Sequence, residues 1–205
     1  MARLVHVVSA GLRADADTEA LEAARALALG LIEAPSTAAV VVGMSSTHLL
    51  VATWLESRDA LEPFAASPAH MAFIMRGVAR VTSGMWSAAA ELDIDVVPPL
   101  EAAGATLFVL GLRGAVEGPQ LYEWEVRALL DGVAALPGVS VAGPTFEERD
   151  RFRAAGAVLV PAATREAFEA AHMSAQASWG DAASALEWAS APVVGLALPR
   201  ASTPR

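Results

Sequence analysis

The 205-residue chain carries a net charge of −9, is 55% hydrophobic, and contains neither cysteine nor lysine. The missing cysteine excludes disulfides, thiolate nucleophiles and cysteine-bound metals, and the missing lysine excludes Schiff-base chemistry through that residue. Nucleic acid is not expected as a partner, because phosphate binding needs a basic face and the arginines are mostly spread singly along an acidic chain.

The apolar residues do not predict a membrane protein. No apolar run reaches the roughly 18 residues that a membrane span requires, because Glu, Asp and Arg interrupt the alanine-rich stretches. The N-terminus has a short strand-like apolar run without the longer hydrophobic region and cleavage site of a signal peptide. We therefore expect a soluble, cytoplasmic protein with no membrane partner.

The first half of the chain predicts the element order β-α-β-β-α-β. Alternating or continuous apolar runs indicate strands, spacing of three and four residues indicates helices, and Ser57 and Ser67 are suitable helix N-caps. Ser45 and Ser46 mark a hairpin turn. The strands are expected at 3–11, 37–46, 47–56 and 85–92, and the helices at 19–32, 57–66 and 69–81.

The second half predicts the same order, which is the ferredoxin-like plan. Strands are expected at 105–114, 138–146, 156–163 and 191–198, and helices at 120–136 and 164–179. A Pro-Pro pair marks a linker at 94–104. The sequence thus predicts a first repeat over 1–95, a second over 105–199 and a flexible tail over 200–205.

A duplication should also show in the register of the two halves. Residues 57–62 match residues 164–169 at an offset of 107. At that offset His48 and His70 fall on alanines and His172 falls on Ala65, which predicts a degenerate second repeat. A single α/β domain is the alternative.

A single ferredoxin-like repeat leaves one face of its sheet bare. The two bare faces of a tandem chain can pack together, and a ligand could lie between them. We therefore expect an α+β protein whose two repeats form an intrachain dimeric α/β-barrel-like unit. Such a chain could be a monomer with an internal pseudo-dimer or a homodimer.

Residues 59–73 contain an aromatic residue, a Pro-Ala-His triplet and an aliphatic residue soon after the third strand. This pattern resembles the stress-responsive dimeric α/β-barrel family, and His6 and His48 also lie where that family commonly places histidines. The resemblance implies a cofactor-free, polyketide cyclase-like enzyme with an acid/base histidine at His70. The family's partner tyrosine lies six residues earlier, where this chain has Phe64.

The residues of the first repeat suggest one catalytic and one binding set. His70 and His6 are the candidate catalytic residues, because imidazole exchanges protons near neutral pH. Each could instead be structural, with His70 bracing its helix and His6 satisfied within the core, and Asp93 could orient His70 or be a solvated turn residue. The candidate substrate-binding residues, which could also be ordinary core, are His48, Trp54, Phe64, Phe73 and Trp86.

We expect no cofactor and no metal, since HExxH and compact histidine spacing are absent and a metal or haem would need convergence in space. The expected partner is a polyketide-like or aromatic small molecule. The leading hypothesis is a polyketide cyclase or related lyase. The alternatives are a cofactorless monooxygenase of the antibiotic-biosynthesis type and a non-catalytic ligand-binding protein.

Overall fold

The structure is a computed structural model that describes residues 2–96, 102–113, 121–142 and 152–199. Residues 97–101 of the predicted linker and the predicted tail 200–205 lie outside the described residues. Within the described ranges, no helix is long and apolar enough to span a bilayer.

The first half follows the predicted order, with its second helical region broken into short pieces. A 3₁₀ turn precedes α2, and a π-helical turn at Phe73–Val78 separates α3 from α4. The elements are β1 (Ala2–Leu12), α1 (Thr18–Leu29), β2 (Thr37–Met44), β3 (His48–Leu55), α2 (Leu61–Ala65), α3 (Pro68–Ala72), α4 (Ala79–Val81) and β4 (Thr82–Val96).

The second half repeats this order with one continuous helix in place of the broken region. Its elements are β5 (Thr106–Arg113), α5 (Glu123–Ala134), β6 (Ser140–Ala142), β7 (Phe152–Val160), α6 (Arg165–Trp179) and β8 (Leu186–Ala197). The prediction placed the start of the last strand at 191, but β8 begins five residues earlier, at Leu186. The α+β class and the tandem ferredoxin-like repeats are confirmed.

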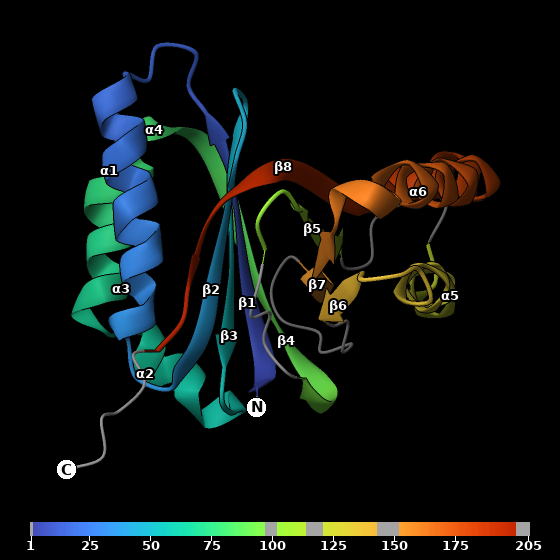
Figure 1. The fold of residues 1–205 in the computed structure, drawn as a ribbon, viewed down its shortest axis with the longest axis horizontal. Helices are drawn as coiled ribbons and strands as arrows, with labels where there is room; N and C mark the ends of the chain where they lie inside the picture. Colours follow the sequence, from blue (N-terminus) through green and yellow to red (C-terminus); the bar gives the residue numbers. More distant parts are fainter. Residues whose placement is uncertain (1, 97–101, 114–120, 143–151, 200–205) are drawn as a thin grey trace.

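The strand β8 joins the two halves through backbone hydrogen bonds. Within the described ranges, eight strands follow the order β4-β1-β3-β2-β8-β5-β7-β6. Residues of β8 up to Pro192 pair with β5, and residues from Val193 onward pair with β2. In Figure 1 this red strand runs from the second half across to the first. One strand therefore holds the repeats in a fixed arrangement.

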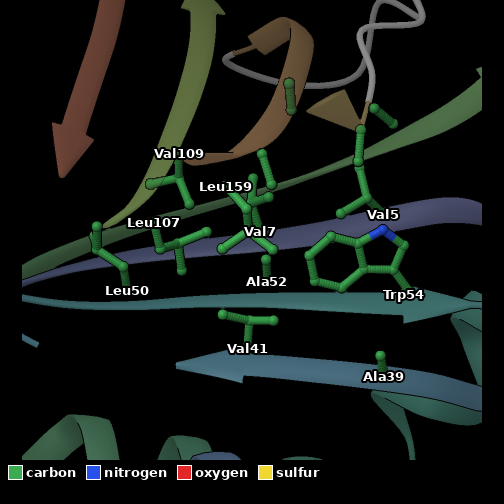
Figure 2. Close-up of a cluster of buried hydrophobic side chains, with 14 of the residues drawn as sticks. Val5, Val7, Ala39, Val41, Leu50, Ala52, Trp54, Leu107, Val109 and Leu159 are labelled. Carbon is green, nitrogen blue, oxygen red and sulfur yellow. The ribbon is translucent and has the colours of Figure 1, made fainter. Parts of the chain in front are cut away.

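The helices cover the outer faces of the two sheets, and the inner faces meet (Figure 1). A cluster of apolar side chains from both sheets fills the interface, including Val7 from β1, Leu107 from β5 and Leu159 from β7 (Figure 2). Trp54 lies in this cluster with 1% of its surface exposed. The central inter-sheet space, expected to hold a ligand, is instead an apolar core formed by the packing of alternate residues from both halves.

Alternation along β1 determines which side chains face the helices. Val5 and Val7 contribute to the inter-sheet core, whereas Leu4 and Val8 pack in a second cluster beneath α1 and the broken helical region. Successive side chains of a strand point to opposite faces. His6 therefore lies on the helix side of the first sheet, facing away from the inter-sheet core.

Candidate functional site

Three rings meet between the first sheet and its helices. His6 comes from β1, Phe64 from α2 and His70 from α3. The ring centroid of Phe64 lies 5.5 Å from that of His6 and 5.0 Å from that of His70, and the two imidazole centroids are 6.0 Å apart. The structure thus brings the two candidate catalytic histidines together, with each imidazole beside the other and beside the same fully buried phenyl ring.

The backbone around His70 fixes where its ring lies. Pro68 occupies the first turn of α3, and the Oγ of Ser67 accepts a hydrogen bond from the backbone N–H of His70 at 3.2 Å. The ring Nδ1 lies 3.0 Å from the carbonyl oxygen of Ala65. Because a carbonyl only accepts, Nδ1 carries the proton and Nε2 of the neutral ring is the basic nitrogen.

Both imidazoles favour the neutral state. Burial lowers the pKa of His70, and the hydrogen bond to the Ala65 carbonyl opposes this shift. Burial, together with the smaller effect of positive charge on His70, lowers the pKa of His6 to about 4. At neutral pH the site therefore offers neutral imidazole, which can accept a proton.

The sheet beneath these rings is lined by small and polar groups. His6 pairs with Ala89 of β4 on one side and with Thr53 of β3 on the other. The Oγ1 of Thr53 is buried and has no hydrogen-bond partner among the described residues. His6 itself is partly exposed.

Phe73 contributes to the same side of the sheet. It is fully buried at the start of the π-helical turn and belongs to the apolar cluster that contains Phe64. Single π-helical turns are rare and often occur at functional sites.

The remaining predicted binding residues lie elsewhere. His48 and Trp86 line a separate cleft on the opposite face of the sheet, and Trp54 lies in the inter-sheet core. His48 and Trp54 share the inward face of β3 because they are an even number of residues apart. The side chain of Asp93 lies outside what the structure describes. Among the described residues, no three His, Asp or Glu side chains gather into a metal-binding group.

The second half contains a related cluster that the sequence alignment missed. His172 of α6 stacks on Trp188 with a centroid distance of 4.3 Å and lies 6.4 Å from Phe168, which in turn contacts Phe108 of β5. Burial lowers the pKa of His172, and its Nε2 has no partner in the described part of the chain.

The equivalence of His172 and His70 corrects the offset of 107. Both residues follow an Ala and precede a Met, at 69–71 and 171–173, which is an offset of 102. His6 and Phe108 have the same offset and the same outward face of their strands. The shared Ala-His-Met tripeptide was the available sequence signal. The second half therefore retains one histidine and has phenylalanine in place of the other.

No protein-family model matches the sequence, and no curated protein matches it either. Three solved structures are similar over nearly the whole chain. A proposed monooxygenase from Fusobacterium nucleatum is 9% identical with a TM-score of 0.62, covering 96% of this chain and 94% of its own. A proposed monooxygenase from Lactobacillus acidophilus is 10% identical with a TM-score of 0.57, covering 97% of each chain.

The third similar structure is an anthrone oxidase-like protein. It is 12% identical with a TM-score of 0.63, covering 99% of this chain and 96% of its own. At these identities the similarity establishes the shared fold over both repeats.

Proposed function

We propose that this chain is a cofactor-independent enzyme that removes a proton from an aromatic or polyketide-like substrate, with Nε2 of His70 as the base. The observation that carries the proposal is the hydrogen bond between Nδ1 of His70 and the carbonyl oxygen of Ala65. It leaves the lone pair on Nε2, in a ring whose pKa is lowered by burial. A positioned neutral imidazole is an effective general base.

The surroundings of His70 favour a planar, weakly charged substrate. The phenyl ring of Phe64 lies beside both imidazoles, and the neighbouring side chains are apolar. Removing a proton from a carbon next to a carbonyl or an aryl ring gives a carbanion that such a substrate delocalises itself. The protein then needs to supply a base, a returning proton and a dry site.

Addition of oxygen to this carbanion is the first candidate for the next step. The structural similarity to two proposed monooxygenases and to an anthrone oxidase-like protein supports it. For a substrate methylene, the overall reaction converts CH₂ and O₂ into C=O and H₂O. The carbanion forms the C–O bond to oxygen, and the protonated imidazole returns a proton to the outer peroxide oxygen. Loss of the second C–H proton then forms the C=O bond and breaks the O–O bond, and the hydroxide that leaves takes up this proton to give water.

Aldol ring closure is the second candidate, as in the plant olivetolic acid cyclase that residues 59–73 resemble. The buried hydroxyl of Thr53 beside His6 favours it, because it is available to donate to a substrate carbonyl. Phe64 weighs against it, because that ring has no hydroxyl where the cyclase has its tyrosine. The oxygenase is therefore the reaction that we favour.

Oxygen uptake with anthrone tests the proposal. We expect the wild-type protein to consume one O₂ per anthrone oxidised, and His70→Ala to lower kcat/KM by about a hundredfold, the usual worth of a general base. His172→Ala is the matched control, since it removes the equivalent imidazole from the other half. Equal rates for wild type and His70→Ala would contradict the proposal. Anaerobic ring closure of a linear polyketide by wild type would favour the cyclase, and binding without turnover would favour a ligand-binding protein.

A further inference from the structure

We propose that the chain has a second small-molecule site, in the cleft where the two halves meet at one end of the inter-sheet core, and that it binds a planar aromatic compound with a hydroxyl group. The cleft has a volume of about 520 Å³, within the usual range for ligand sites. None of the rings of the His70 site lines it. This proposal therefore does not rest on the proposed reaction.

The floor of the cleft is low because two glycines lie side by side. Gly11 of β1 pairs with Gly84 of β4 on one side and with His48 of β3 on the other. A Cβ atom added to Gly84 would meet no other atom within 4 Å. Gly84 thus leaves open space on this face of the sheet, near the imidazole of His48, whereas a Cβ atom at Gly11 would lie 3.3 Å from the Oγ of Ser83.

The walls come from both halves of the chain. Trp86 stands in the next row of the first sheet, and Glu187 and Ala189 face it from β8 of the second half. The carboxylate of Glu187 is held by Arg113, whose Nη2 and Nε lie 2.6 and 2.8 Å from its Oε1. This ion pair fixes one wall in place.

The chemistry of these walls selects the ligand class. The indole of Trp86 provides an aromatic surface against which a planar ring can pack. The Nδ1 of His48 lies 3.0 Å from the Thr47 hydroxyl, so Nε2 is the ring nitrogen that can bind a ligand. A hydroxyl group can donate to or accept from that nitrogen. The carboxylate of Glu187 disfavours an anionic ligand.

Imidazole NMR signals can locate a ligand, because the chain has four histidines and each can be assigned by substitution. We choose 2-naphthol as the probe and naphthalene, which lacks the hydroxyl group, as the control compound. We expect 2-naphthol to shift the His48 signal in the wild type and equally in His70→Ala. Naphthalene should bind the cleft up to about tenfold more weakly, the worth of one hydrogen bond.

Gly84→Leu fills the cleft and Gly30→Leu is the matched control, because a Cβ at Gly30 also meets no atom within 4 Å. We expect Gly84→Leu to abolish the His48 shift and Gly30→Leu to retain it. If Gly84→Leu does not fold, Gly84→Ala decides, with weaker binding expected. The proposed site would be contradicted if 2-naphthol did not shift the His48 signal. It would also be contradicted if the shift were equal with glycine and with a larger residue at position 84. Loss of anthrone turnover in His70→Ala bears only on the other site.

Discussion

The imidazole of His70 and the carbonyl of Ala65 are joined by a 3.0 Å hydrogen bond between the ends of two short helices. The contact spans the break between α2 and α3, where Ser67 caps the second helix through the backbone N–H of the same histidine. One residue is thus held at its backbone and at its ring. This arrangement fixes the basic nitrogen as Nε2.

The pH dependence of turnover should follow this histidine. A base acts in its unprotonated form, and burial lowers the pKa of His70 below the usual 6.5. We expect kcat/KM to be constant above pH 6.5 and to fall about tenfold per pH unit below the pKa of His70. Rate measurements from pH 4.5 to 8 test this. Activity that rises as the pH is lowered would mean that His70 must be protonated to act.

The stability of the fold should also depend on pH through His6. Its pKa is about 4 in the folded protein and close to 6.5 when unfolded, so the unfolded chain binds more protons between these values. The stability that the folded protein keeps while His6 is neutral is fully present above pH 6.5 and is lost as the pH falls to about 4. Over that interval the wild type should lose up to about 3 kcal/mol more stability than His6→Phe.

Phe108 shows that phenylalanine fits the equivalent place in the other half. Urea unfolding of the wild type and His6→Phe at pH 7 and pH 4.5 measures the difference. If both proteins lost the same stability between pH 7 and pH 4.5, protonation of His6 would not be the cause of the loss.

The buried hydroxyl of Thr53 should affect binding and stability in opposite directions. Thr53→Val removes a hydroxyl that has no partner in the described structure, so we expect stability to rise by about 1 kcal/mol. If the hydroxyl meets the ligand beside His6, kcat/KM should fall up to about tenfold. Chemical denaturation and steady-state kinetics separate the two effects. A clear loss of stability would reveal a protein partner for this hydroxyl.

Gly43 marks the close approach of the two halves. A Cβ atom there would lie 3.1 Å from the carbonyl oxygen of Ala191 and 3.3 Å from the Cβ of Leu107. We expect Gly43→Ala to cost about 1–3 kcal/mol through overpacking. Gly30→Ala, in open space at the end of α1, should be neutral or slightly stabilising. Equal unfolding midpoints for the two variants would contradict the tight junction.

The element order could be predicted from the sequence because its signals are local. The apolar runs of β1 and β5, the serine cap before His70 and the turn at Ser45 are each set by a few neighbouring residues. The sheet face that meets the helices could not be predicted, because alternation gives two faces without saying which is covered. His6 was therefore grouped with His48 and Trp86, which lie on the other side of the same sheet.

The second-half histidine was missed for a different reason. The first half breaks its helix before Pro68, whereas α6 continues without a break, so the offset between the repeats changes along the helical region. The offset of 107 that matches residues 57–62 with 164–169 therefore does not apply to the histidines that follow, His70 and His172. His172 then fell on Ala65, although its surroundings correspond to those of His70.

Proton abstraction can be measured directly, apart from any later step, as exchange of the anthrone methylene hydrogens with D₂O in the absence of oxygen. We expect the wild type and His172→Ala to accelerate this exchange equally, and His70→Ala to lose about a hundredfold of the acceleration. Exchange that is as fast with His70→Ala as with the wild type would contradict the assignment of His70 as the base.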